Sequence, residues 1–291
     1  MADSLPIPSS VDSLISLALE EDLGQRGDVT AQFFIPRDHQ SSARIITREP
    51  VVVAGTGTAE AVFCAVDPKL EIKVLCADGL RLNPGEGLMA ITGSTQSILT
   101  AERTALNFLQ RLTGIATITR QYVDAVKGTK TQVLDTRKTT PGWRALEKAA
   151  VLAGGGCNHR MGLFDAIMVK DNHLVADGGA EDIAAAVKAA REKYHGICIE
   201  LEVDTLEQLE AYLQISGIDV ILLDNMKPEL LAQAVAMRDE RAPAVKLEAS
   251  GGITLDTVAG VAASGVDFVS VGALTHSVRA VDLSLDLQSN A

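Results

Sequence analysis

The sequence has few aromatic residues, no excess of positive charge and no long apolar run. Phe, Trp and Tyr make up 3% of the 291 residues, and the formal net charge is −12. Because nucleic acids bind to positively charged grooves and aromatic stacking platforms, this composition argues against a nucleic-acid partner. No stretch approaches the roughly 18 uninterrupted apolar residues of a membrane span, and no basic N-terminal segment leads into an apolar run. We therefore expect a cytoplasmic protein without a membrane partner.

Cysteine is scarce as well, which limits disulfide and thiolate-metal chemistry. The four cysteines are far apart and form no C-x-x-C pair; they are Cys64, Cys76, Cys157 and Cys198. Because metal sites and disulfide frameworks usually show closely spaced cysteines, we expect reduced and mostly buried thiols.

The first part of the chain mixes helices with strands. A helix is predicted between Ser10, which can cap it, and Gly24, which ends it. Three β-rich segments separated by turn residues follow, over residues 43–54, 70–76 and 88–92. A long amphipathic helix is predicted over residues 97–126. We expect residues 1–114 to form a smaller α+β domain.

The second part has a regular alternation of strands and helices. Six short apolar strands are predicted at residues 131–135, 166–170, 198–203, 219–224, 245–249 and 267–272. The last four begin roughly two dozen residues apart, the length of one βα unit, which requires right-handed crossovers between parallel strands. Because six strands are too few for a closed eight-stranded barrel, we predict an incomplete α/β barrel over residues 115–274. Residues 281–287 alternate apolar and polar side chains, which predicts that the tail, residues 275–291, returns to the first domain as a strand.

Cations gather where two of these strands end. Arg137 and Lys138 follow the first strand, and Lys170 ends the second. Residues 136–170 contain six Lys or Arg residues against two acidic ones. Such a cluster at the carboxyl ends of parallel strands favours a substrate with carboxylates and phosphates. Solvated helix surface is the favoured explanation for three other cations: Arg111, Arg144 and Lys148.

Glycine loops follow the last two strands. The first loop, between a predicted strand and a predicted helix, contains Ser250, Gly251 and Gly252. The second loop follows the next predicted strand and contains Gly272 and Ala273. Backbone N–H groups and a helix dipole at such loops bind phosphate. The alternative is a pair of tight turns that require positive φ. Two such loops in succession favour phosphate, whereas Gly55-Thr56-Gly57 lacks the third glycine of a dinucleotide fingerprint.

Carboxylates end two neighbouring strands. Glu202, which shares a face with Glu200, and Asp224 can hold Mg²⁺ against a substrate phosphate. A salt bridge to the nearby cations is an equally supported alternative.

Short motifs in order along nearly the whole chain carry a family resemblance. They are EDLG at residues 21–24, GDVT at 27–30, ERTALN at 102–107, DTRKT at 135–139, GGCNHR at 155–160, KDNH at 170–173, LDN at 223–225, SGG at 250–252 and VGALTH at 271–276. Together they resemble the quinolinate phosphoribosyltransferases, the decarboxylating enzymes of de novo NAD synthesis.

The resemblance implies a fold, an assembly and a reaction. The fold is an open, seven-stranded α/β barrel behind an N-terminal domain. The assembly is a homodimer, in some members packed into a hexamer, whose active site is completed by the partner's N-terminal domain. The reaction transfers phosphoribose from phosphoribosyl pyrophosphate to quinolinate with decarboxylation and gives nicotinate mononucleotide, CO₂ and pyrophosphate. It requires Mg²⁺ and no redox cofactor.

The resemblance also implies residue roles. It places the quinolinate carboxylates against Arg137, His159, Arg160, Lys170 and the partner subunit's Arg103. It places phosphoribosyl pyrophosphate against Lys138, its ribose and Mg²⁺ against Glu202 and Asp224, and its 5′-phosphate against Ser250, Gly251, Gly252, Gly272 and Ala273, with His276 a weaker candidate. The catalytic groups are expected to be Lys138, Lys170, Glu202 and Asp224.

Two alternative functions stay open at this point. A Schiff-base aldolase or isomerase would use Lys170 with the same phosphate loops. A divergent relative would keep the scaffold and bind another anion, as molybdenum-linked homologues of this family do.

Overall fold

Two compact units make up the computed structural model, which describes residues 10–170 and 180–288. The first unit comprises the described parts of residues 1–120, 139–155 and 274–291, and the second comprises those of residues 121–138 and 156–273. The domain boundary between residues 114 and 115 stays a prediction. No helix among the described residues is long and apolar enough to cross a membrane.

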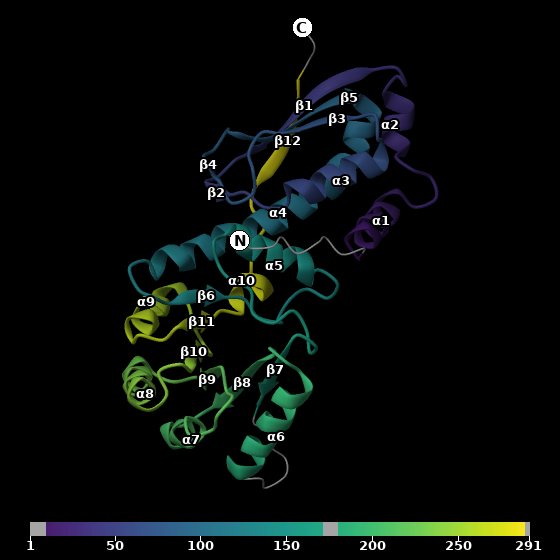
Figure 1. Ribbon diagram of the computed structural model, residues 1–291. Coiled ribbons are helices and arrows are strands. Elements are labelled where there is room, and N and C mark those ends of the chain that lie inside the picture. Colours follow the sequence, from purple (N-terminus) through teal and green to yellow (C-terminus); the bar gives the residue numbers. More distant parts are fainter. Residues whose placement is uncertain (1–9, 171–179, 289–291) are drawn as a thin grey trace. The chain divides into compact units, whose positions relative to one another are not determined.

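The first unit contains a four-stranded antiparallel sheet in the order β12-β1-β5-β3 (Figure 1). Its strands are β1 (Gln40–Thr47), β3 (Glu71–Val74), β5 (Gly87–Ser94) and β12 (Leu283–Gln288). β12 pairs with β1, so the C-terminal segment joins the sheet formed by the N-terminal part of the chain, as its alternating pattern predicts. A separate two-stranded ribbon pairs β2 (Val51–Val52) with β4 (Arg81–Leu82).

The helices of the first unit follow the apolar periodicity of the sequence. They are α1 (Ser10–Leu23), α2 (Val29–Phe34), α3 (Thr56–Val66), α5 (Arg144–Ala153) and most of α4 (Thr95–Ala125). The predicted helix from Ser10 is confirmed, and Gly24 follows it with a φ of 49°. The long helix is confirmed as α4, which buries Leu109, Leu112 and Ile115 at a spacing of three residues.

Helices α2 and α3 are absent from the sequence prediction. The sequence carries no signal for the beginning of α3, because the residue before the helix, Gly55, adopts a φ of 91° and offers no capping side chain. Asp78 supplies the cap from another segment: its carboxylate accepts hydrogen bonds from the N–H groups of Gly55 and Thr56 at 2.8 and 3.2 Å. A cap from 22 residues further along the chain leaves no local signal.

The expectation of solvated surface is wrong for Lys148 and only partly correct for Arg111, which is half-buried. Lys148, on α5, is only 1% exposed. Arg111, on α4, donates hydrogen bonds to Oε1 of buried Glu147 at 2.9 Å and to the carbonyl of Thr275 at 2.7 Å. The charged side of α5 therefore belongs to the interior of the first unit, whereas Arg144 is half-buried.

The expectation of mostly buried thiols is only partly correct. Cys76 is buried and Cys157 and Cys198 are half-buried, but Cys64 is exposed. Cys64 follows the buried pair Val62 and Phe63 on α3, so helical periodicity turns it toward solvent.

The second unit contains a six-stranded sheet, and every predicted strand is confirmed. The strands are β6 (Gln132–Leu134), β7 (Ala166–Val169), β8 (Cys198–Val203), β9 (Val220–Asp224), β10 (Lys246–Ser250) and β11 (Phe268–Ser270). All pairs are parallel, in the order β6-β11-β10-β9-β8-β7. β6 and β7 are consecutive in the chain but lie at opposite edges, so the barrel is open between them. The resemblance implies seven strands, and the described residues place six in this sheet.

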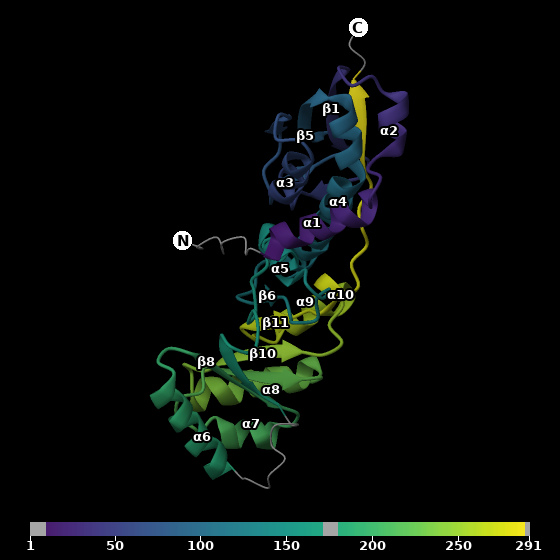
Figure 2. The ribbon, with the colours of Figure 1, turned by 90° about the vertical axis from the view of Figure 1, so that its right-hand side faces the viewer.

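Helices cover one face of this sheet. They are α6 (Ala180–Lys193), α7 (Leu206–Tyr212), α8 (Pro228–Arg241) and α9 (Leu255–Ala263), and they follow one another along the sheet (Figures 1 and 2). A one-turn helix, α10 (Ala273–His276), follows β11. Ile199, Leu201, Ile221 and Leu247 are at most 1% exposed, as expected for the face that packs on the helices.

A buried ion pair fixes α8 to this sheet. The Arg238 side chain is 2% exposed, and its Nη1 donates to Oδ2 of Asp267 and to the carbonyl of Val245, both at 2.7 Å. The N–H of Leu247 donates to the same carboxylate at 3.1 Å. Burial raises the pKa of Asp267, but the hydrogen bonds from Arg238 and Leu247 outweigh it and lower the pKa to about 2.

Removing this carboxylate has a pH-dependent effect. Because the pKa of Asp267 in the folded state lies below that of the unfolded chain, its ionisation stabilises the fold above about pH 4. That contribution is lost as the pH falls through about 2. We expect Asp267→Asn to lower the free energy of unfolding by on the order of 2 kcal/mol at pH 7. The difference from wild type should shrink between pH 4 and pH 2 in urea titrations, and a difference that stays constant with pH would contradict this assignment.

Candidate active site

The inner face of the second sheet carries the polar side chains. Parallel pairing places Glu202 beside Leu222, Leu222 beside Glu248, and Glu248 beside Phe268. Because alternate residues of a strand share a face, Glu200, Asp224, Ser250 and Ser270 lie on this face too. Glu200 and Glu202 therefore share a face as predicted, and neighbouring strands align further charges with them.

A cavity of about 800 Å³ lies at the carboxyl ends of these strands. We call it the carboxyl-end cavity. It brings together nine of the predicted site residues: Arg137, Lys138, His159, Arg160, Lys170, Asp224, Ser250, Gly251 and Gly252. A second cavity of about 410 Å³, the amino-end cavity, is lined by residues near the beginnings of the strands, among them Gln132, Ala166, Cys198 and Val220. His159, Arg160 and Glu248 line both cavities.

Cations of the carboxyl-end cavity repel each other and are balanced by carboxylates. Burial and the charge of Arg137 lower the pKa of Arg160, while Glu200 and Asp165 raise it. Lys170 forms an ion pair with Oε2 of Glu202. An anion that enters this cavity would meet positive charges that are only partly neutralised.

Three side chains form a buried network between the two cavities. Nε2 of His159 lies 3.0 Å from Oε2 of Glu200 and 3.5 Å from Oε2 of Glu248. Nδ1 of His159 accepts the N–H of Arg160 at 2.6 Å, so the proton of the neutral ring is on Nε2, toward the carboxylates. The backbone N–H of His159 donates to buried Asp135 at 2.8 Å. His159 thus lines the carboxyl-end cavity while both its ring nitrogens make contacts within the protein.

Two carboxylates of this network are almost completely buried. Glu200 and Glu248 are each 2% exposed. Burial and the neighbouring charge of Glu200 raise the pKa of Glu248 to about 7, although His159, Ser270 and Lys170 oppose the rise. Carboxylate oxygens of Glu200 and Glu248 and a ring nitrogen of His159 lie within 4.8 Å of one another.

The glycine loop after β10 has a geometry that other residues cannot adopt without strain. Gly251 has a φ of 93°, and a Cβ on it would lie 2.1 Å from Oδ1 of Asn225. Gly252 has a φ of 60° and open space around it. The positive φ angles expected of tight turns are therefore present, and both glycines also line the carboxyl-end cavity.

Other predicted site residues lie elsewhere. Glu202 forms an ion pair with Lys170 on the inner face of the sheet. Gly272 and Ala273 lie where β11 passes into α10. Among the described residues that line the carboxyl-end cavity, these three do not appear. Arg103 and His276 belong to the first unit, and both are exposed. Residues 171–173 of the KDNH motif fall outside the described residues.

Sequence reasoning assigned no role to Glu200, Glu248 or Asn225. A signal was present for Glu248, because a carboxylate inside the short apolar strand VKLEA is costly to bury. Its pairing with Glu200 depends on the register of three strands and could not be read from either segment alone.

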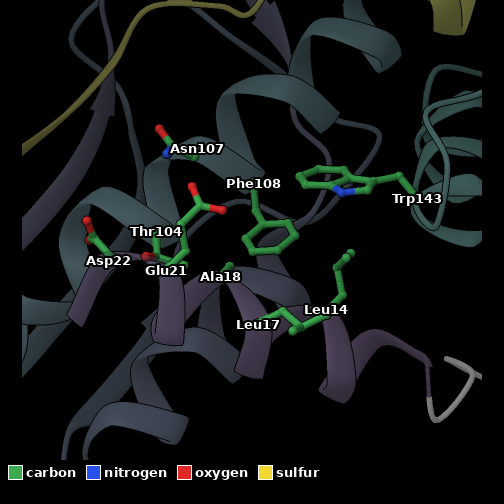
Figure 3. A pocket seen from close by; sticks show the side chains of 9 residues that line it. All are labelled: Leu14, Leu17, Ala18, Glu21, Asp22, Thr104, Asn107, Phe108 and Trp143. Atoms are coloured by element: carbon green, nitrogen blue, oxygen red, sulfur yellow. The ribbon is translucent and has the colours of Figure 1, made fainter. Parts of the chain in front are cut away.

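The first unit has a pocket of about 270 Å³ where two of the motifs meet (Figure 3). Glu21 and Asp22 of EDLG lie near Thr104 and Asn107 of ERTALN at one end. At the other end Phe108 stacks on Trp143, with ring centroids 4.6 Å apart and planes 17° from parallel. Residues of both motifs therefore line one pocket of the first unit.

An open parallel sheet with cations and a glycine loop at its carboxyl end defines an α/β enzyme for a phosphorylated, acidic small molecule. Family models match almost the whole described chain: the quinolinate phosphoribosyl transferase N-terminal domain over residues 28–113 and the C-terminal domain over residues 115–286. The chain belongs to the quinolinate phosphoribosyl transferase family.

Individual relatives agree with this assignment. The chain is 46% identical to a nicotinate-nucleotide pyrophosphorylase of Mycobacterium leprae, over 94% of this chain and 95% of the relative. It is 42% identical to a chloroplastic nicotinate-nucleotide pyrophosphorylase of Arabidopsis thaliana, over 95% of this chain and 82% of the relative. The solved nicotinate-nucleotide pyrophosphorylase of Francisella tularensis superposes with a TM-score of 0.88 at 39% identity, over 96% of each chain.

The glycine loop yields a matched pair of variants. We expect Gly251→Ala to weaken binding of ribose 5-phosphate by roughly tenfold or more, because the new Cβ meets Asn225 and the backbone must shift. Gly252→Ala should weaken it less, because only the left-handed backbone is strained, at about 1 kcal/mol. Titration calorimetry measures both. Equal affinities in the two variants would mean that the loop does not hold the phosphate.

Proposed function

We propose that the chain transfers the phosphoribosyl group of phosphoribosyl pyrophosphate to the ring nitrogen of quinolinate with loss of CO₂. The products are nicotinate mononucleotide and pyrophosphate. The observation that carries the proposal is the carboxyl-end cavity, where Arg137, Arg160 and Lys170 line the same space as the Ser250–Gly252 loop. The names of relatives support it, since two enzymes of Nicotiana glauca and Nicotiana tabacum are called decarboxylating quinolinate phosphoribosyltransferases.

The acid substrate takes its position from the cations. Two adjacent carboxylates on one ring match the guanidinium groups of Arg137 and Arg160, which bind carboxylates through paired hydrogen bonds. Binding relieves the repulsion that lowers the pKa of Arg160. Lys170 exchanges its contact with Glu202 for a substrate carboxylate, which frees the Glu202 carboxylate for the ribose side of the cavity.

Phosphoribosyl pyrophosphate takes its position from the loops and from oxygen ligands. The Ser250–Gly252 loop holds its 5′-phosphate, with Gly272 and Ala273 beside it, and Lys138 contacts its pyrophosphate. Asp224 and Asn225 line the cavity with oxygen atoms, and Glu202 adds a carboxylate, so the donor set suits Mg²⁺. When bound, Mg²⁺ would supply positive charge against the pyrophosphate oxygens.

The chemistry follows from these charges. As pyrophosphate departs, positive charge develops on the ribose, and the carboxylates of Glu202 and Asp224 stabilise it. The ring nitrogen then bonds to the ribose, and the resulting cationic ring can accept the electron pair left when the adjacent carboxylate departs as CO₂. A Schiff base on Lys170 is disfavoured, because an ammonium group paired with Glu202 is a poor nucleophile.

The assembly is part of the proposal. Arg103 is exposed on α4 in its own subunit, which is compatible with a homodimer in which the partner subunit's Arg103 contacts the substrate carboxylates.

A product assay tests the function. The purified protein with quinolinate, phosphoribosyl pyrophosphate and Mg²⁺ should form nicotinate mononucleotide and CO₂ in equal amounts, and nicotinate should not replace quinolinate. Arg137→Ala should lower kcat/KM for quinolinate by roughly a hundredfold or more, whereas Lys188→Ala on the exposed side of α6 should leave it unchanged. Quinolinate that binds without product formation would instead indicate a divergent relative with another acceptor.

A further inference from the structure

The proposed reaction leaves a requirement that none of the groups above meets. When CO₂ departs, the electron pair of the broken bond stays on the ring carbon, and a proton must replace the lost carboxylate. The inference below rests on the proposed function and concerns the source of that proton.

Most groups around the carboxyl-end cavity are unsuited to this task. Guanidinium groups are poor proton donors near neutral pH, so the arginines of this cavity are unsuited to the task. Lys138 and Lys170 serve as fixed positive charges for the anions. A carboxyl group delivers a proton near neutral pH only if its surroundings favour the protonated form.

Glu248 has such surroundings. It lies on the inner face of β10, 2% exposed, between Leu222 of β9 and Phe268 of β11. The charged and titratable groups that face it are Glu200 from β8, His159 from the loop before β7 and Lys170 from the end of β7. Burial and the Glu200 charge outweigh His159, the hydrogen bond with Ser270, and Lys170, and raise the pKa of Glu248 to about 7. Its Oε1 is buried and has no hydrogen-bond partner among the described residues, so one oxygen is available to carry a proton.

Glu248 also connects two separate spaces. It lines the carboxyl-end cavity, where the substrate binds, and the amino-end cavity, which is lined by polar groups including Gln132, Asn158 and Asp165. When substrate occupies the carboxyl-end cavity, the amino-end cavity is the other space that Glu248 lines. A proton can therefore return to Glu248 from the amino-end cavity, with Nε2 of His159 3.5 Å from its Oε2.

We propose that Glu248 donates the proton that replaces CO₂ on the pyridine ring and is reprotonated from the amino-end cavity after each turnover. In the step, the bond between the ring carbon and the carboxylate breaks, CO₂ leaves, and its electron pair stays on the carbon. That pair takes the proton of Glu248, which becomes a carboxylate. Water in the amino-end cavity then returns one proton, so one proton is consumed per turnover and no oxidant or reductant takes part.

A single-turnover experiment with Glu248→Gln separates this role from a structural one. The amide keeps the shape of the side chain and cannot act as an acid. Pyrophosphate forms before CO₂ is lost, so its first-turnover rate should stay within about threefold of wild type, while nicotinate mononucleotide forms roughly a hundredfold more slowly. Rapid-quench measurement of both products gives the two rates, and circular dichroism verifies the fold.

Other outcomes overturn the proposal. If both products slow equally, Glu248 supports substrate binding or the fold, and if neither slows, another group supplies the proton. If the wild-type protein forms no pyrophosphate from the two substrates, the proposed function itself fails, which this experiment distinguishes from a failure of Glu248.

The pH dependence gives an independent readout. Wild-type kcat should fall as the pH rises through about 7, where Glu248 loses its proton, and Glu248→Gln should lack this fall. Glu200→Gln removes the neighbouring negative charge, so the fall should move to lower pH by about one unit. A fall that keeps its position in Glu200→Gln, or that persists in Glu248→Gln, would overturn the proposal.

Discussion

Glu200 and Glu248 lie buried beside the cations of the carboxyl-end cavity, and the rest of the site depends on this compensation of charge. Two like charges about 4 Å apart repel by about 4 kcal/mol at an effective dielectric constant of about 20. Glu200 reduces this cost for Arg160, while His159 and Lys170 offset part of the cost of burying Glu248. The negative charge does not fully balance the positive charge, because a pKa of about 7 favours the protonated, neutral form of Glu248. An anionic substrate supplies the remaining negative charge.

The sheet makes this arrangement possible through its parallel register. One face of the sheet carries apolar residues and packs on helices, so the polar residues share the other face. Polar residues near the carboxyl ends of the strands line one cavity, and polar residues near the amino ends line the other. The barrel is open between β6 and β7, which are the two edge strands of the sheet. Arg137 and Lys170 follow the carboxyl ends of these two strands. The same open scaffold thus brings together residues that are far apart in the chain, and it leaves space for two substrates at one end of the sheet.

Sequence patterns alone could predict the six strands, the long helix α4 and the strand-end cations, because each depends on local periodicity or on the position of a residue at the end of a strand. The roles of Glu200 and Glu248 could not be predicted, because the two carboxylates meet only through the register of β8, β9 and β10. The ion pair of Arg111 with buried Glu147 could not be predicted for a related reason, since the two residues lie on different helices, α4 and α5. Helix α3 was missed because its cap, Asp78, is distant in sequence.

A crystal structure of the protein with quinolinate bound would test the central account of charge compensation most directly. The account predicts that the two substrate carboxylates contact Arg137 and Arg160 and that Lys170 moves from Glu202 to a substrate carboxylate, with Glu248 beneath the ring. Quinolinate bound elsewhere, or bound in this cavity with the pair between Lys170 and Glu202 intact, would contradict it.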